Sequence, residues 1–527
     1  MSHPIQPEVS SLTNKDILIC TLNSTYQHSS FGLRYIYAQM AEMTSITELI
    51  EWTIKENPRN IVEKILTLNP KIVGFGVYIW NNEQVFEVCS ILKKVAPDIE
   101  LVLGGPEVSY ETEGQRLYQL ADHIICGEAD LLFPQFCREH LSGHDSQDKI
   151  IRGALPLLPD LKLPYYLYSD NDIANRVIYV EASRGCPYKC EYCLSSLDKS
   201  VRSFNLDQFL ADIEILINRG ARCFKFVDRT FNLSPTTSTK ILNFFMQHLD
   251  KGLFLHFEMV PDRLPVEIRD LIKQFPAGSL QFEVGIQTLN PVVATNVSRK
   301  NDLVKVAENF KFINEHTHVH THADLIVGLP GETLESFGEG FDRLAQLGPH
   351  EIQVGILKRL KGTPIVRHES TFKMRYQDFS PYQILSTSTM DYATLQKMNR
   401  FAKFWDLYAN SGDFPQFMKW ISTFEGSFFW NYMKFVDYLS EKYSETHSIS
   451  LMNLAEKAYD YILMRTDDSE KAFDIIRADF CEGVKKRDIP PFMKAQVIAK
   501  GLGAQSVTGS AAKKSSSLNS RQVAHLS

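Results

Sequence analysis

Three cysteines within eight residues constrain this chain more than any other feature. Cys186, Cys190 and Cys193 follow the spacing C-x3-C-x2-C, on a loop with glycine and proline that comes after the strand-like run Val177 to Glu181. Thiolates are the usual ligands of iron–sulfur clusters, and a cubane cluster has four irons to ligate. Three local cysteines leave one iron open to a small molecule, which favours an open-site [4Fe–4S] cluster.

Two alternatives to a cluster have to be weighed against the same residues. A structural zinc site wants a fourth protein ligand, usually from a second C-x2-C or H-x3-H pair, and the sequence has no such pair. The nearest later cysteine, Cys223, stands alone in an apolar run. Three unconnected structural cysteines fit poorly with a polar loop. We therefore predict that Cys186, Cys190 and Cys193 hold the cluster.

The cysteine spacing, with the aromatic Tyr192 directly before the last cysteine, resembles the radical S-adenosylmethionine (radical SAM) superfamily. The resemblance implies a partial (β/α)6 barrel, and the chain carries six matching apolar runs separated by amphipathic segments. In parallel βα barrels chemistry collects where strands end, and the cysteine loop follows the first run. The expected strands are Val177–Ala182, Cys223–Asp228, Leu253–Met259, Leu280–Ile286, His320–Val327 and Glu351–Leu357.

Polar residues are expected at several of these strand ends. In radical SAM enzymes of the coproporphyrinogen-dehydrogenase type, matching positions contact S-adenosylmethionine. By that resemblance Glu258 reaches the ribose, and Gln287, Arg299 and Asp324 line the rest of the pocket. Each residue alone also fits a salt bridge or a helix cap. Their order along successive strand ends favours a shared binding site.

Residues 14–140 alternate continuous apolar strands with amphipathic helices, as in a parallel sheet covered on both faces. Gly76, Gly104 and Gly105 are expected at strand carboxyl ends, where ligands bind in such sheets. Any one of them alone is explained by a tight turn. Together, Val-Gly-Phe-Gly-Val-Tyr and Leu-Gly-Gly-Pro-Glu resemble the Rossmann-like cobalamin-binding domain that precedes many radical SAM barrels.

One motif of cobalamin proteins is absent from this region. The D-x-H-x-x-G motif, which supplies a histidine to cobalt in some of them, does not occur, and Asp122 and His123 are adjacent instead. If cobalamin binds, the resemblance implies that its cobalt lacks that histidine. The same absence also fits a domain that has lost cobalamin.

The remaining domain boundaries follow from composition and periodicity. Residues 141–175 are polar and then rich in proline and leucine, which predicts a linker before a barrel over residues 176–365. Over residues 366–500 apolar and aromatic residues recur at helical spacing, and the strand signal disappears, which predicts a helical domain. The segments Arg359 to Pro364 and Pro381-Tyr-Gln-Ile-Leu385 resemble an uncharacterised subgroup of radical SAM proteins with a cobalamin-binding domain and an additional C-terminal helical domain. Residues 501–527 cannot build a core and are expected to be disordered.

Four alternating histidines stand before and within the fifth expected strand. In an extended segment His316, His318, His320 and His322 all point to one side, an array that can bind a metal. His316 and His318 are expected in a loop and not in a site. His322 shares the barrel-facing side with Asp324, so we expect it near a substrate.

Charge and composition restrict partners and location. The net charge of −7 over 527 residues gives no general reason to expect binding to nucleic acid or to a membrane surface. No apolar run approaches the roughly 18 residues of a membrane span. Nine cysteines in so long a chain do not form a disulfide framework, and the N-terminus lacks the pattern of a signal peptide. These observations favour a cytoplasmic protein.

The resemblance implies reductive cleavage of S-adenosylmethionine and, with cobalamin, modification of an unactivated carbon, in the first place by methylation. Cobalamin-assisted rearrangement or cyclisation without net methylation is the enzymatic alternative. A cobalamin or redox sensor is the non-catalytic alternative. Expected partners are a small-molecule substrate and an external electron donor such as flavodoxin or ferredoxin. The sequence does not identify the substrate or a catalytic side chain.

Overall fold

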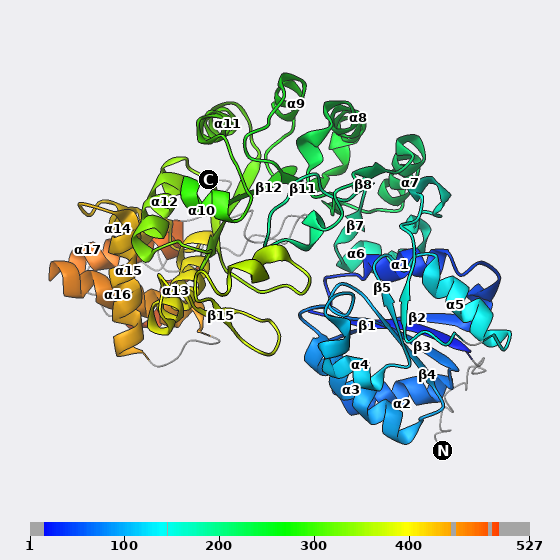
Figure 1. Ribbon diagram of the computed structural model, residues 1–527. Helices are drawn as coiled ribbons and strands as arrows, with labels where there is room; N and C mark the ends of the chain where they lie inside the picture. Colours follow the sequence, from blue (N-terminus) through cyan, green and yellow to red (C-terminus); the bar gives the residue numbers. More distant parts are fainter. Residues whose placement is uncertain (1–14, 145, 444–448, 483–486, 495–527) are drawn as a thin grey trace, which may run out of the picture.

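The computed structural model describes residues 15–144, 146–443, 449–482 and 487–494 (Figure 1). It contains two six-stranded parallel sheets, followed by a mainly helical region. The expected α/β class, with a Rossmann-like region, a partial barrel and a helical C-terminal part, is confirmed. The disorder expected for residues 501–527 lies outside the described residues.

The first sheet has the strand order β2-β1-β3-β4-β5-β6, and all its strands are parallel. The order reverses between β1 and β3, so a crevice forms beyond their carboxyl ends. Apolar clusters bury both faces of the sheet. Its strands are β1 (Ile17–Asn23), β2 (Thr47–Thr53), β3 (Ile72–Gly76), β4 (Glu100–Gly104), β5 (His123–Cys126) and β6 (Ile150–Arg152). Its helices are α1 (Phe31–Ala38), α2 (Pro58–Leu68), α3 (Asn82–Val95), α4 (Arg116–Leu120) and α5 (Leu132–Leu141).

Both edge strands of this sheet differ from the sequence-based expectation. The β2 strand is only partly buried, as expected at the edge of a sheet. Its sequence, Thr-Glu-Leu-Ile-Glu-Trp-Thr, is therefore not the continuous apolar run of an interior strand. The β6 strand falls inside the predicted linker, residues 141–175, yet it pairs with β5. The linker prediction is therefore wrong for Ile150–Arg152.

The second sheet has the order β14-β13-β12-β11-β10-β7, so β7 and β14 are the two open edges of a partial barrel. A short antiparallel pair, β8 (Ser183–Arg184) with β9 (Arg202–Ser203), brackets the cysteine loop. The barrel strands are β7 (Ile178–Val180), β10 (Cys223–Phe226), β11 (Phe254–Met259), β12 (Leu280–Gln287), β13 (His320–Val327) and β14 (Glu351–Ile356). The helices around them are α6 (Asp170–Asn175), α7 (Leu206–Asn218), α8 (Pro235–Met246), α9 (Val266–Ile272), α10 (Pro291–Asn296), α11 (Leu303–His316) and α12 (Leu334–Gln346).

The helical region packs on the outside of the barrel beside β14, at the left of Figure 1. Its aromatic side chains form core, as the contact of Phe341 on α12 with Trp405 shows, with ring centroids 4.7 Å apart. The expected loss of strands is wrong at one place, because β15 (Arg375–Tyr376) pairs with β16 (Ile384–Ser386). The helices are α13 (Tyr392–Trp405), α14 (Pro415–Ser422), α15 (Phe428–Lys442), α16 (Leu451–Thr466) and α17 (Ser469–Arg477).

The segment after β14 also contacts the first sheet's domain. Lys361 Nζ lies 2.8 Å from Glu107 Oε1, and Tyr382 Oη donates to the same oxygen at 2.6 Å. Asn82 Nδ2 donates to it as well, at 2.8 Å. Glu107 is buried, so this cluster fixes one part of the chain to another about 250 residues away.

Among the described helices, none combines the length and the apolar character that a bilayer crossing requires.

Candidate functional site

The cysteine loop is held by its own backbone and by its neighbours. Gly185 has a φ of +92°, and a Cβ there would overlap Ser200 O, so only glycine fits directly before the first cysteine. Cys186 N donates to Asp198 O at 3.1 Å. Cys193 N donates to Cys190 O at 3.2 Å, which closes the second half of the loop.

Glu191, a buried residue between the second and third cysteines, holds the loop in place through its hydrogen bonds. Glu191 N donates to Val297 O, and its carboxylate receives hydrogen bonds from Ser298 Oγ at 2.5 Å and from Arg367. His368 Nε2 lies 2.9 Å from the other carboxylate oxygen. These partners come from the turn after α10 and from the segment after β14, so two distant parts of the chain fix the loop's position.

A cavity of about 150 Å³ lies beside the loop. The structure brings all three cysteines to its wall, together with all four residues predicted to bind S-adenosylmethionine: Glu258, Gln287, Arg299 and Asp324. The placement of two of them differs from the expected strand ends. Asp324 is the fifth of the eight residues of β13, so it reaches the cavity from within the barrel, and Arg299 lies in the segment between α10 and α11.

Charged groups surround this cavity. Arg229 Nη1 donates to Glu258 Oε1 at 2.8 Å, and Arg299 Nη1 lies 3.3 Å from Cys190 Sγ. Burial raises the pKa of Glu258 and, to a larger extent, that of Asp324, where the neighbouring carboxylates Glu283 and Glu258 raise it further. The site therefore holds carboxyl groups whose charge depends on what binds beside them.

Glu283 also lines the cavity but is not among the residues predicted from the sequence. Glu283 lies on β12, and its Oε2 is 2.8 Å from His256 Nε2. Burial opposes ionisation of Glu283, but the hydrogen bond from His256 and the charge of Lys225 hold its pKa well below the usual value. A signal was present, because Gln281, Glu283, Gly285 and Gln287 alternate along one strand and so share a face.

The residues of this cavity fit the groups that the motif implies. Three cysteines face one space, which suits a cluster with an open iron. Within the described part of the chain, Asp324 Oδ1 and Arg299 Nε are buried without a hydrogen-bond partner. An anionic and a cationic group of this kind suit a ligand that carries both an amino and a carboxylate group. A Cβ on Gly285 would lie 2.6 Å from Gln287 Nε2, so glycine keeps the amide in place.

A second cavity, of about 480 Å³, lies between the carboxyl ends of the first sheet and the barrel. All three glycines predicted for cobalamin, Gly76, Gly104 and Gly105, line it. The barrel contributes Arg184 and the residues after the cysteine loop, Leu194, Ser195 and Asp198. The wall is mostly apolar and includes Phe31, Leu33, Val102 and Ile125, as a broad ring system requires.

The two histidines that could reach this region have other partners. His28 Nδ1 lies 2.6 Å from Tyr179 Oη, and His123 contacts Asp148 O at 2.8 Å and Glu100 at 3.0 Å. Among the described residues that line the cavity, none is a histidine. The geometry therefore fits cobalamin without a protein imidazole on its cobalt.

The three glycines are not equivalent. Gly105 has a φ of +104°, and a Cβ there would lie 2.5 Å from Val77 O, so the fold itself demands glycine. At Gly104 the nearest atom to a Cβ is Ile125 O at 3.6 Å, and at Gly76 it is Thr21 Oγ1 at 3.4 Å. Of the three, only Gly105 is thus explained without a ligand.

The alternating histidines do not form one array. His316 is the last residue of α11, and His318 lies before β13 and is exposed. His320 and His322 lie on β13. The expectation that His322 approaches a substrate beside Asp324 finds no support, because His322 does not line that cavity and its Nε2 lies 3.1 Å from Glu351.

Three family models match successive parts of the chain. The "B12 binding domain" matches residues 17–136, the "Radical SAM superfamily" residues 180–344, and a "protein of unknown function (DUF4080)" residues 370–523. The matches follow the order of the two sheets and the helical region. The cofactors of the first two families are cobalamin, a [4Fe–4S] cluster and S-adenosylmethionine.

Curated relatives are distant. The cobalamin-dependent radical SAM methyltransferase TokK of Streptomyces tokunonensis is 24% identical over 332 residues, which are 55% of this chain and 47% of the relative. The uncharacterised methyltransferase PH0819 of Pyrococcus horikoshii is 23% identical over 58% of this chain and 70% of its own length. The chain spans about half the length of TokK and of a carbapenam methyltransferase of Streptantibioticus cattleyicolor.

Two solved structures share the fold. The cobalamin-dependent S-adenosylmethionine radical enzyme OxsB, solved with aqua-cobalamin and S-adenosylmethionine, has a TM-score of 0.58 at 12% identity, over 95% of this chain and 82% of its own. The radical S-adenosylmethionine methyltransferase TsrM of Kitasatospora setae has a TM-score of 0.56 at 14% identity, over 67% and 74%. The chain thus carries a region that matches the radical SAM superfamily, preceded by one that matches the B12 binding domain and followed by one that matches DUF4080.

Proposed function

We propose that this protein is a cobalamin-dependent radical SAM methyltransferase that acts on a carbon atom of a small molecule. One observation carries the proposal: Ser195 lines both cavities, so the two candidate cofactor sites adjoin directly after Cys193. A methyl donor in one cavity and a radical source in the other would then share one substrate. The names of TokK and TsrM, both methyltransferases, support the choice of methylation over rearrangement.

When bound, the three cofactors supply an electron, a hydrogen-abstracting radical and a methyl group. The chain's own residues bind and orient these groups. Cys186, Cys190 and Cys193 ligate three irons. Glu258 and Gln287 hold the nucleoside of S-adenosylmethionine, while Asp324 and Arg299 pair with its charged amino-acid part. These four side chains are partly buried in the wall of the cavity.

The first sheet's glycine-lined ends would hold cobalamin. The proposed partners are a small-molecule substrate, which would bind between the two domains, and an external electron donor for the cluster, such as flavodoxin or ferredoxin. These partners belong to the proposal, since the similarity to the curated methyltransferases covers about half of their length.

The test uses the full-length protein, reconstituted with iron, sulfide and cobalamin under anaerobic conditions. With a reductant and S-adenosylmethionine carrying a CD3 group, we expect 5′-deoxyadenosine, S-adenosylhomocysteine and a labelled methyl group on cobalamin. The triple variant Cys186→Ala, Cys190→Ala, Cys193→Ala should lose the first product and retain cobalamin. Matched single variants at Cys89 and Cys137, both buried in the first domain, should retain every product.

Two results would contradict the proposal. Formation of 5′-deoxyadenosine without transfer of the CD3 label favours cobalamin-assisted rearrangement or cyclisation. A protein that binds cobalamin and a cluster but produces neither nucleoside under reductant is a sensor and not an enzyme.

A further inference from the structure

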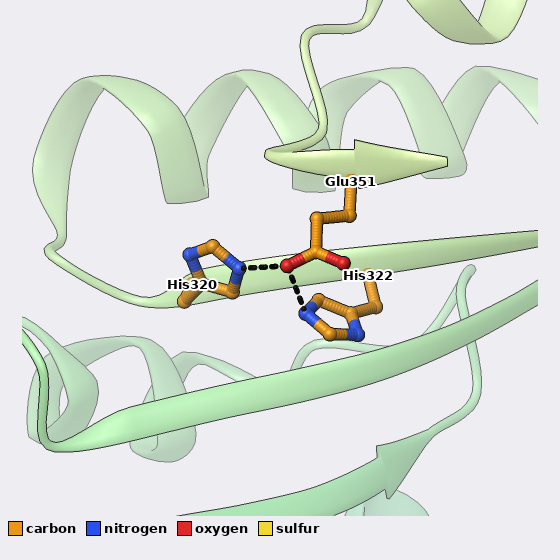
Figure 2. Close-up of side chains that lie close together, drawn as sticks. All are labelled: His320, His322 and Glu351. Carbon is orange, nitrogen blue, oxygen red and sulfur yellow. Dashed lines mark hydrogen bonds and ion pairs between the residues drawn. The ribbon is translucent and has the colours of Figure 1, made fainter. Parts of the chain in front are cut away.

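Two histidines and a glutamate converge inside the barrel, apart from both cavities. His320 and His322 lie on β13, and Glu351 is the first residue of β14 (Figure 2). Figure 2 shows both imidazoles directed at the same carboxylate. His320 Nε2 lies 3.3 Å and His322 Nε2 3.1 Å from Glu351 Oε1. The three ligand atoms all lie within 4.8 Å of one another.

Strand geometry and not a loop places these three side chains. His320 and His322 are two residues apart, so they project from the same face of β13. The parallel register pairs His322 directly with Glu351 on the neighbouring strand. Positions fixed by hydrogen-bonded strands vary little, which is what a metal site with a defined geometry requires.

Burial and outer contacts complete the site. His320 is 7% exposed and Glu351 is 2% exposed, so neither side chain is an ordinary surface group. The Nδ1 atom of His322 lies 2.8 Å from Gln353 Nε2 and 3.3 Å from Gln281 Nε2. Metal-binding histidines regularly use their second ring nitrogen in this way, because the outer partner fixes the orientation of the ring.

We propose that His320, His322 and Glu351 bind one divalent transition-metal ion, in the first place Zn²⁺, through their two Nε2 atoms and a carboxylate oxygen. Two histidines and a carboxylate are a known zinc ligand set, and its bond lengths place adjacent ligand atoms about 3.4 Å apart in a tetrahedron. The observed nitrogen–oxygen separations are 3.3 and 3.1 Å. The ion therefore fits with small side-chain shifts, and water takes the fourth position. When the ion binds Nε2 of His322, the ring proton resides on Nδ1, and the amide of Gln353 turns its oxygen toward the ring to accept it.

The proposed ion is separate from the cluster. Its ligands include no thiolate, and His256 lies between it and the cavity of the cysteines: the rings of His256 and His322 are 6.5 Å apart, and His256 contacts Glu283. The ion joins the open-edge strand β14 to β13. Its loss should therefore loosen that edge and lower the thermal stability of the protein.

The experiment measures zinc and iron together in the reconstituted full-length protein, after dialysis against a weak chelator. We expect roughly one zinc per chain, bound in addition to the iron of the cluster. X-ray absorption at the zinc edge should show only nitrogen and oxygen neighbours at about 2.0–2.1 Å. Zinc should also raise the melting temperature, since it binds the native state.

Variants separate this site from adventitious binding. His322→Ala and the isosteric Glu351→Gln should each reduce the zinc content roughly tenfold and leave iron and sulfide unchanged. His318→Ala, an exposed histidine of the same run, is the matched control and should keep its zinc. Zinc–sulfur scattering at about 2.3 Å, which marks metal on the cysteines, would overturn the proposal. Two further results would overturn the proposal: full zinc content in both variants, or no bound zinc after incubation with a tenfold excess of the metal. The second result is the one expected if the three residues form only a hydrogen-bonded cluster.

Discussion

Arg184 holds Asp130 through two parallel hydrogen bonds, from Nη1 to Oδ2 at 3.1 Å and from Nη2 to Oδ1 at 3.0 Å. Arg184 opens the cysteine motif, whereas Asp130 belongs to the domain that the B12-binding model matches. Nη1 also donates to Glu128 at 3.0 Å, and the guanidinium lies over the ring of Tyr35. One side chain thus links the start of the cysteine motif to the B12-binding region.

Arg184→Lys should keep the charge and lose the paired contact. Both side chains are largely buried, so we expect lower stability, on the order of 1–3 kcal/mol, from denaturant unfolding. Iron content should not change, but transfer of the CD3 label should fall much more than formation of 5′-deoxyadenosine. Equal losses of both products would show that Arg184 does not couple the two cavities. Arg219→Lys, a more exposed arginine in an ion pair with Asp170, is the control.

Asp324→Asn should weaken binding of S-adenosylmethionine about tenfold, or about 1.4 kcal/mol, because the amide cannot neutralise the ligand's ammonium group. The substitution conserves shape, so iron and sulfide content should remain. Equilibrium dialysis with labelled S-adenosylmethionine measures the affinity. Asp270→Asn, on the exposed face of α9, should bind like the unmodified protein. Equal affinity of the Asp324 variant and this control removes Asp324 from the site.

Gly104→Val and Gly105→Ala should fail in different ways. A Cβ at Gly104 meets only an ordinary contact, Ile125 O at 3.6 Å, so the Gly104→Val protein should remain folded but lose cobalamin, as measured by its absorbance after gel filtration. Alanine at Gly105 should destabilise the protein with or without cobalamin, since its φ is positive and its Cβ meets Val77 O. Cobalamin binding by the Gly104 variant at the level of the unmodified protein would contradict the assignment of that cavity.

Glu332→Gln should remove one contribution to the pH dependence of stability. Glu332 is buried after β13, and Thr288 Oγ1 donates to its Oε1 at 2.7 Å. Burial raises the pKa of Glu332 from 4.5 to about 7, although the hydrogen bond opposes this. Between these two values the native state keeps a proton that the unfolded chain releases, so this group's contribution to stability falls as the pH rises from 4.5 to about 7.

Glutamine carries no charge at either pH. The variant should match the unmodified protein at pH 4.5 and exceed its stability at pH 8 by on the order of 1–3 kcal/mol, as measured by urea unfolding. A difference between the two proteins that is the same at both pH values would contradict burial of the charge as its cause.

The sequence predicts the interior strands well and the edge strands poorly, for a physical reason. Interior strands such as β1 and β3 are covered on both faces, and their boundaries can be read from apolar runs. The strands β2 and β6 have one exposed edge and read as polar or short segments. The strands β15 and β16 are too short for an alternation of apolar and polar residues to be recognised in the sequence.

The same difference applies to the candidate sites. The cysteines are close in sequence, so their spacing alone predicts a common centre. Glu283 needs only the alternation along its own strand, but its partner His256 comes from the neighbouring strand. Glu351 lies 29 residues after His322, and only the register of β13 with β14 brings the two together. Sequence periodicity does not contain that register.

The contact of Lys361 with buried Glu107 has a consequence for how this chain can be divided. The N-terminal domain is held at both ends of the barrel sequence: by Arg184 near its start and by Lys361 after its last strand. A fragment that stops at the linker would lose the contacts of Lys361 and Tyr382 with the Glu107 carboxylate. The three family regions are thus not structurally independent of one another. Domain exchange between such proteins has to carry both attachment points or redesign Glu107.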